Sequence, residues 1–176
     1  LDRDGVINIR NYQGYITSVN EFHFIDGVIE SLIILKNYFS YIFIVTNQQG
    51  VGKRIMSEED LIIINNYMTE NINKEIKIID KVYYCPHIAE LNCTCRKPKI
   101  GMYEQAIADY PDIINMKKCM IGDTISDMKF ARNSNMTSVL IGEQNNISEN
   151  ELSYIDIIVP SLYIFAKHCF DKSFKI

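Results

Sequence analysis

The sequence predicts an α/β fold in which a Rossmann-like parallel β-sheet has helices on both faces. Short apolar, β-branched runs recur along the chain, helical patterns lie between them, and chemically reactive polar residues follow several of the runs. Alternating strands and helices are typical of a parallel sheet. Ligands in such folds bind where the strands end, so the residues after each strand are the candidates for function.

The expected strands are continuous apolar runs, which indicates burial on both faces of the sheet. The most apolar of them is Tyr41–Thr46. Four shorter runs of the same kind follow it: Lys81–Cys85, Lys118–Gly122, Thr137–Ile141 and Asp156–Val159.

Helical spacing of apolar residues predicts four helices between these strands. Ser57–Ile76 has the clearest start, because Ser57 can cap it and the acidic residues that follow suit the positive end of the helix dipole. The other three are Asp26–Phe39, Met102–Asp109 and Ser126–Ser134. No repeat, low-complexity tract or linker divides the sequence, so we expect a single domain over residues 1–176.

Composition narrows the class of function. The 176 residues have a net charge of −4 and no basic tract, which argues against a nucleic-acid partner. The apolar run Ile29–Leu35 is too short to cross a bilayer, and no segment resembles a signal peptide. We therefore expect a cytoplasmic protein without a membrane or nucleic-acid partner. We also expect a monomer.

Four polar motifs lie at or beside the expected strand ends: Asp2–Asn8 (DRDGVIN), Thr46–Lys53 (TNQQGVGK), Arg96–Lys99 (RKPK) and Met120–Asp127 (MIGDTISD). Each alone has an ordinary explanation, as a turn, a polar loop, a solvated charged turn or a helix cap. The first lacks the later glutamate and the flanking helices of a calcium loop, and the second lacks the spacing of a P-loop. Gathered at one sheet edge, the four predict a phosphoryl-transfer site.

The residue types suggest how such a site would work. Of Asp2 and Asp4, one carboxylate can attack phosphorus and the other can exchange a proton with the leaving oxygen. Asp123 can hold a divalent cation opposite Asp2, and an oxygen-rich site suits Mg²⁺. Asp127 lies one turn into the next helix, as its cap or as a brace.

The set DRDGV, VTNQQG, CRKPK and IGDTISD resembles the haloacid dehalogenase superfamily of phosphotransferases. It is similar to the small branch with a minimal cap, which holds heptose-bisphosphate and histidinol-phosphate phosphatases. The resemblance covers Leu1 to about Ile141. It implies a haloacid dehalogenase-like fold, catalytic Mg²⁺, and hydrolysis of a small phosphorylated metabolite through an aspartyl-phosphate intermediate on Asp2.

The resemblance also implies roles for individual residues. Asp2 is expected to be the nucleophile and a Mg²⁺ ligand, and Asp4 the general acid/base that offers its main-chain carbonyl to the metal. Asp123 is the remaining carboxylate ligand, and Lys97 stabilises charge on the phosphoryl group. Thr46 is expected to bind the phosphoryl group and completes the catalytic set of Asp2, Asp4 and Lys97. The residues expected to bind the phosphoryl group or the rest of the substrate are Asn47, Gln48, Arg96, Lys97, Gly14 and Tyr15.

Three of the five cysteines share one segment with a histidine: Cys85, His87, Cys93 and Cys95. Cys₃His is a standard closed set for structural zinc, although the spacings are tighter than in common zinc fingers. The alternative is a surface loop with free thiols, which oxidation disfavours. The branch named above has zinc in this segment. The resemblance therefore implies a structural Zn²⁺ that staples the loop and positions Arg96 and Lys97.

The resemblance divides over the substrate. Gly101-Met102 and Phe22–Ile29 are similar to the heptose-bisphosphate enzymes, whereas Gly50–Gly52 and the short spacer before Cys93 are similar to the histidinol-phosphate enzymes. We expect D-glycero-D-manno-heptose 1,7-bisphosphate, cleaved at its 7-phosphate, with histidinol phosphate as the alternative.

Two hypotheses from other classes remain, a non-catalytic zinc-binding module and a phosphate-sensing regulator. The presence of both Asp2 and Asp4 argues against them, because a decayed enzyme is expected to lose one of the pair.

The family pattern also needs a buried apolar strand directly before Asp2, where only Leu1 stands. We expect the natural chain to have several apolar, β-branched residues upstream that form a central strand of the sheet.

Overall fold

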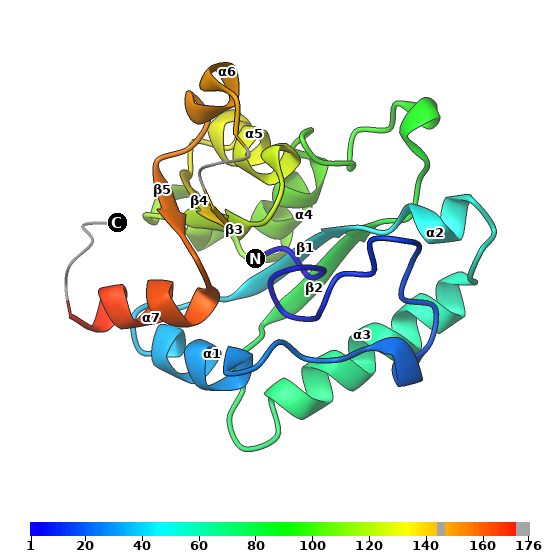
Figure 1. Cartoon of the computed structure of the whole chain (residues 1–176), viewed down its shortest axis with the longest axis horizontal. Coiled ribbons are helices and arrows are strands. Elements are labelled where there is room, and N and C mark those ends of the chain that lie inside the picture. Colours follow the sequence, from blue (N-terminus) through cyan, green and yellow to red (C-terminus); the bar gives the residue numbers. More distant parts are fainter. Residues whose placement is uncertain (144–146, 172–176) are drawn as a thin grey trace.

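Five parallel strands in two half-sheets form the centre of the computed structural model, within the described residues 1–143 and 147–171 (Figure 1). In one half-sheet, β1 (Phe43–Asn47) pairs with β2 (Lys81–Cys85). In the other, β4 (Thr137–Ile141) lies between β3 (Cys119–Gly122) and β5 (Ile157–Val159). The predicted parallel sheet is thereby confirmed, and each observed strand falls on a predicted run.

Helices cover both faces of the strands, as the sequence predicts (Figure 1). On one face, α1 (Val28–Lys36), α3 (Glu58–Ile72) and α7 (Leu162–Phe170) bury apolar side chains in one core cluster. On the other face, α4 (Gly101–Asp109) and α5 (Ile125–Asn133) form a second cluster. Successive strand residues alternate between the two clusters, because side chains along a strand point to opposite faces. No helix in the described part of the chain is both long and apolar enough to cross a bilayer.

The predicted start of α3 is confirmed, but its end is earlier than expected. The Ser57 hydroxyl accepts a hydrogen bond from Asp60 N, and the Asp60 carboxylate accepts one from Ser57 N, which forms a capping box. The helix ends at Ile72, not at Ile76, because the Asn73 side chain binds the backbone of Ile78 and Ile79 and stabilises a turn there. A polar side chain that offers the backbone an alternative to helix explains the shorter span.

Short elements complete the described chain. Two of them are the four-residue helices α2 (Gln49–Gly52) and α6 (Glu149–Leu152). The 3₁₀ turns are η1 (Val19–Glu21), η2 (Ala89–Leu91) and η3 (Pro111–Asn115).

Residues Leu1 and Asp2 join the two half-sheets. The Leu1 ammonium donates to Phe43 O at 2.8 Å, and Val45 N donates to Leu1 O at 2.8 Å. On the other side, Asp2 N donates to Ile121 O at 2.9 Å. An apolar cavity of about 340 Å³ lies beside Leu1, lined by residues of both β1 and β3. Asp2 is therefore held at the middle of the sheet by backbone bonds, and the central strand expected upstream stays a prediction.

Candidate active site

The strand ends bring the four polar motifs together at a pocket of about 300 Å³. It is lined by predicted site residues from each motif and by neighbours that the sequence did not single out: Asp2, Asp4, Arg10, Asn11, Tyr15, Ile16, Thr46, Asn47, Gln48, Gln49, Arg96, Lys97, Thr124, Ser126 and Asp127. Gly14, predicted beside Tyr15, is exposed and does not belong to this lining.

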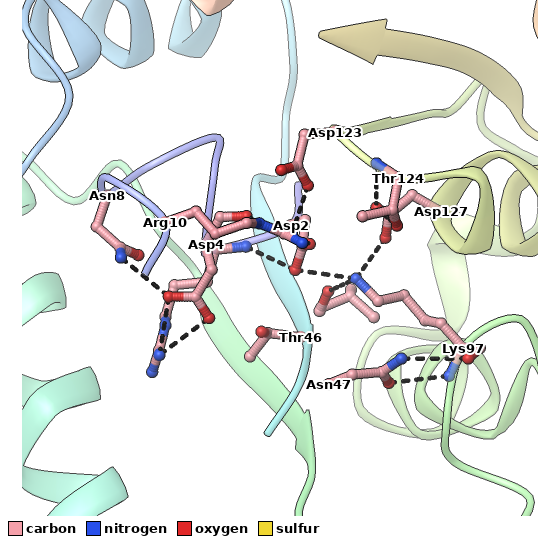
Figure 2. A network of polar contacts seen from close by, with 12 residues as sticks. Asp2, Asp4, Asn8, Arg10, Thr46, Asn47, Lys97, Asp123, Thr124 and Asp127 are labelled. Atoms are coloured by element: carbon pink, nitrogen blue, oxygen red, sulfur yellow. Dashed lines mark hydrogen bonds and ion pairs between the residues drawn. The ribbon is translucent and has the colours of Figure 1, made fainter. Parts of the chain in front are cut away.

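Asp2 is buried and lines this pocket, and one of its carboxylate oxygens is fixed by neighbouring groups (Figure 2). Its Oδ1 accepts from Arg3 N at 2.8 Å and lies 2.9 Å from Lys97 Nζ. The same Nζ contacts Asp127 Oδ1 at 2.5 Å and donates to Val45 O at 2.6 Å. Burial raises the pKa of Asp2, and Lys97 opposes that rise. Burial likewise disfavours charged Lys97, but Asp127 and Asp2 outweigh it and raise the pKa of Lys97, so the lysine stays cationic.

Asp127 is both the cap and the brace that the sequence suggested. It is fully buried, and its Oδ2 accepts from Thr124 N at 3.2 Å and Thr124 Oγ1 at 2.6 Å at the start of α5. Its other oxygen contacts Lys97. Gly122 makes this approach possible, since a Cβ there would lie 2.3 Å from the Cβ of Asp127.

Three side chains fix the Asp4 carboxylate. It accepts from Arg3 Nη2 at 3.1 Å, from Asn8 Nδ2 at 2.9 Å and from Gln48 Nε2 at 2.7 Å. Arg3 is fully buried, and its Nη1 donates to Asn65 Oδ1 at 3.1 Å. Burial disfavours the charged form of Asp4, but Arg3 and the bonds from Asn8 and Gln48 outweigh it and lower the pKa of Asp4. The resting state of Asp4 is therefore the carboxylate.

Arg10 contacts a cluster of oxygen atoms around Asp2 (Figure 2). Its Nη2 lies 2.6 Å from Asp123 Oδ1, 2.9 Å from the Asp4 main-chain oxygen and 3.7 Å from Asp2 Oδ2. Burial raises the pKa of Asp123 to about 7, and Arg10 opposes that rise. Gly5 is required beside this cluster, because its φ is +90° and a Cβ would lie 2.0 Å from Asp123 Oδ2.

These oxygens fit the predicted divalent cation. Carboxylate oxygens of Asp2, Asp123 and Asp127 all lie within 4.8 Å of one another, and hard cations prefer such ligands. Asp127 is already engaged by Lys97 and Thr124. Asp2, Asp123 and the Asp4 carbonyl remain, which is the predicted ligand set, and the guanidinium among them shows that this position attracts positive charge.

The side chains expected to bind the phosphoryl group are partly engaged within the protein. Thr46 Oγ1 is buried and accepts from Gln48 Nε2 at 2.9 Å. The Asn47 amide donates to Lys97 O at 3.1 Å and accepts from Lys97 N at 3.0 Å. Asn47 therefore positions Lys97, and Gln48 links Asp4 to Thr46.

The four predicted zinc ligands converge in one loop. Cys95 Sγ lies 3.2 Å from Cys85 Sγ, 3.5 Å from Cys93 Sγ and 3.3 Å from His87 Nδ1. Cys85 Sγ lies 3.5 Å from Cys93 Sγ and 3.7 Å from His87 Nδ1. Tetrahedral zinc with Zn–S bonds of about 2.3 Å separates its sulfur ligands by about 3.8 Å. The three sulfur–sulfur distances are about 0.3–0.6 Å shorter than this, and all four ligand atoms lie within 4.8 Å of one another. A small outward shift of the thiols would therefore give a closed tetrahedral zinc site.

Comparison with known proteins identifies the family. A family model described as HAD-hydrolase-like matches residues 94–163. The chain is 37% identical to a D-glycero-α-D-manno-heptose-1,7-bisphosphate 7-phosphatase of Campylobacter jejuni, over 82% of this chain and 81% of that protein. It is 33% identical to a D-glycero-β-D-manno-heptose-1,7-bisphosphate 7-phosphatase of Haemophilus ducreyi, over 92% of each.

The chain belongs to the haloacid dehalogenase-like hydrolases. It is a phosphatase of that family, as the resemblance implies. The fold agrees: the crystal structure of a D,D-heptose 1,7-bisphosphate phosphatase from B. bronchiseptica, complexed with magnesium and phosphate, superposes with a TM-score of 0.82. At 22% identity the match covers 97% of this chain and 96% of that one.

Sequence reasoning missed four residues that shape the site of this phosphatase: Arg3, Asn8, Arg10 and Asn65. The sequence could have indicated a role for Arg3 and Asn8, because they are polar residues within the short DRDGVIN motif. The indication for Asn65 was weaker, because it is a polar residue on the apolar face of a helix. There was none for Arg10, since its contact with Asp123 spans 113 positions and depends on the path of a loop.

Proposed function

We propose that this phosphatase removes the 7-phosphate of D-glycero-D-manno-heptose 1,7-bisphosphate, with Mg²⁺ and an aspartyl-phosphate intermediate on Asp2. The observation that carries the proposal is the buried Asp2–Lys97–Asp127 chain, which lines a small polar pocket and lies next to a cluster of carboxylate oxygens. The relatives described above bear the names of heptose-bisphosphate 7-phosphatases. The enzyme would work as a cytoplasmic monomer on a small phosphorylated sugar.

Asp2 is the nucleophile in this proposal. Its carboxylate attacks phosphorus, the ester bond breaks, and the departing sugar oxygen takes a proton from Asp4. Lys97 stays beside Asp2 and offsets charge on the transferring phosphoryl group. Mg²⁺ held by Asp2, Asp123 and the Asp4 carbonyl would neutralise phosphoryl oxygens. Rigid backbone bonds at Asp2 support in-line attack, because small misplacement of a nucleophile is costly in rate.

Asp4 serves the second step as a base. It takes a proton from water, the water oxygen attacks phosphorus, and inorganic phosphate leaves while Asp2 is regenerated. Arg3, Asn8 and Gln48 favour the carboxylate that this step needs. Asp4 enters the first step in its acid form, so the first step carries the free-energy cost of protonating a group with a low pKa.

The remainder of the pocket is assigned to the substrate. Thr46 would donate its hydroxyl to the transferring group. Tyr15 and Arg96 line the same pocket, and a guanidinium fits a second phosphate, which a bisphosphate has and histidinol phosphate lacks. Arg96 directly follows Cys95 and donates to His87 O at 3.4 Å. A structural Zn²⁺ on Cys85, His87, Cys93 and Cys95 would thus fix the loop that presents it.

Phosphate release tests the proposal. Purified protein is offered both anomers of heptose 1,7-bisphosphate and, separately, histidinol phosphate, with and without Mg²⁺. We expect one equivalent of phosphate from position 7, seen by ³¹P NMR, only with Mg²⁺, and a kcat/KM at least about tenfold above that for histidinol phosphate. Preference for histidinol phosphate, or release without a divalent cation, contradicts it. The Asp2→Asn protein controls for contaminating phosphatases.

A further inference from the structure

One nitrogen atom of Arg10 contacts all three groups that the proposed function assigns to Mg²⁺ (Figure 2). Nη2 lies 2.6 Å from Asp123 Oδ1, 2.9 Å from Asp4 O and 3.7 Å from Asp2 Oδ2. These oxygens come from the first loop and from the residue after β3, far apart in the sequence. The guanidinium therefore binds as a cation in the middle of the ligand set.

Charge explains why Arg10 binds there. Three buried or nearly buried carboxylates of Asp2, Asp123 and Asp127 lie within 4.8 Å of one another, and they repel. Lys97 pairs with Asp2 and Asp127. Among the ion pairs of the described residues, Arg10 is the cation that contacts Asp123. Lys97 and Arg10 thus supply two cations for three carboxylates, and Arg10 pairs with the one that Lys97 does not contact.

The same position cannot hold Arg10 and Mg²⁺ together. Mg²⁺ binds oxygen at about 2.1 Å. A Mg²⁺ ion bound to Asp123 Oδ1 and Asp4 O would meet the nitrogen that lies 2.6 and 2.9 Å from the same two atoms. Two cations in van der Waals contact repel, and they repel more strongly in a partly buried site than in bulk water.

The Arg10 side chain is also weakly held in this position and could move away from it. Its side chain is 27% exposed, and it lies in a loop next to Ile9, which is 57% exposed. Its Nε is buried without a hydrogen-bond partner, which weakens its hold on this position. Arg10 lines the pocket as well, so the guanidinium has polar space to enter.

We propose that Arg10 is a tethered counter-cation that holds the ligand oxygens together in the metal-free enzyme and that Mg²⁺ must displace. The inference rests on the Mg²⁺ site of the proposed function. Arg10 lowers the apparent affinity for Mg²⁺, as an internal competitor does, and stabilises the metal-free site in exchange.

Calorimetric titration with MgCl₂ tests the competition. Arg10→Gln should bind Mg²⁺ about tenfold more tightly than the wild type, and Arg54→Gln, which removes an exposed cation, should match the wild type. Metal-free Arg10→Gln should melt at a lower temperature than the wild type, and saturating Mg²⁺ should close the gap. Equal or weaker Mg²⁺ binding by Arg10→Gln overturns the inference but leaves the Mg²⁺ site intact. If the wild type and both variants bind no Mg²⁺, the proposed function fails as well.

Chemical labelling tests the displacement without any variant. Phenylglyoxal modifies accessible arginines, and peptide mass spectrometry reads each site. Mg²⁺ should raise the labelling of Arg10 in the wild type and leave that of Arg54 unchanged. Labelling of Arg10 that does not respond to Mg²⁺ overturns the inference.

Discussion

The two half-sheets bring different chemistry to the same pocket. In the β1–β2 half, Thr46 lies near the end of β1, and the chain after β2 leads through the four predicted zinc ligands to Lys97, so this half offers a hydroxyl and a cation. The β3–β4–β5 half ends beside Asp123 and offers carboxylates. Asp2 lies between them, bonded through its backbone to β3 and through Leu1 to β1. The pocket is therefore assembled from the β1–β2 half, which is suited to phosphate and is called the phosphate half below, and the β3–β4–β5 half, which is suited to a metal ion and is called the metal half.

Because of this difference, we expect that the affinity for phosphate and the affinity for Mg²⁺ can be changed independently. Changes on the β1–β2 half should alter the binding of phosphate and spare Mg²⁺. Changes on the β3 half should do the reverse, and Asp2 alone should affect both.

The largest effect is expected at Asp2, which lies between the two half-sheets. Asp2→Asn should lower turnover by about a thousandfold or more, because an amide is neither a nucleophile nor a good Mg²⁺ ligand. Steady-state kinetics on purified protein measures it, with circular dichroism to confirm the fold. Turnover like that of the wild type would remove Asp2 from the mechanism.

Loss of zinc should disturb the phosphate half. We expect one zinc per chain, and Cys95→Ser should lose the metal and at least about 3 kcal/mol of the free energy of unfolding, since the loop has little core of its own. Elemental analysis and thermal melting measure both. Cys169→Ser, a buried thiol outside the cluster, should keep its zinc. A reduced wild-type protein with no zinc contradicts the site.

The metal half is tested with two aspartates that differ in the group they offer. Asp123→Asn should weaken Mg²⁺ binding by about a hundredfold, because a carboxylate ligand is lost. Asp4→Asn should weaken it much less, since Asp4 would use its main-chain carbonyl. Calorimetric titration compares them. Equal losses would mean that the Asp4 side chain binds the metal.

Thr46→Val probes the phosphate half with a change of similar shape. It removes a buried hydroxyl and should lower kcat/KM about tenfold, with Mg²⁺ affinity unchanged. Thr69→Val, on α3 away from the pocket, is the matched control. A loss of Mg²⁺ affinity in Thr46→Val would break the separation of the two halves.

The smallest effect is expected at Asp156, which lies in the β3–β4–β5 half but does not line the pocket. Asp156 accepts from Ser138 N and Oγ and from Arg132 Nη2. Burial opposes its charge, but these bonds outweigh burial and lower the pKa of Asp156 below its ordinary value of 3.8. Its stabilisation is therefore complete above about pH 4 and disappears as the pH falls through the folded-state pKa.

Asp156→Asn should cost about 1 kcal/mol in the free energy of unfolding at pH 7. The difference from the wild type should shrink in acid, while both ligand affinities stay unchanged. Urea denaturation at several pH values measures this.

Sequence reasoning reached the strands more exactly than the helix ends. Lys81–Cys85 and Thr137–Ile141 match the predicted runs to the residue, because β-branched apolar residues leave few alternatives. The helix at α3 was predicted too long, since the periodicity continues past Asn73 and only its side-chain bonds to Ile78 and Ile79 end the helix. The helix α7 was missed, and it packs on α1 from the far end of the chain.

The site divides in the same way. Asp2, Asp4 and Asp123 could be predicted as candidate site residues, because each lies within a recognisable motif. Of the partners that set their charge states, Lys97 and Gln48 were predicted as site residues, but Arg3, Asn8 and Arg10 were not. Arg10 reaches Asp123 across 113 positions, and the Asn47 side chain is engaged by the Lys97 backbone, which only the folded chain reveals.

The close contact between Gly5 and Asp123 has a consequence for missense mutations at this position. Every missense change at a glycine codon adds a side chain, and here even a methyl group would displace the Asp123 carboxylate. Alleles altered at position 5 should therefore behave as null alleles, although the position has no functional group. In a saturation mutagenesis screen, position 5 should tolerate as little change as Asp2 and Asp4, the proposed catalytic residues that precede it, and added Mg²⁺ should not rescue it.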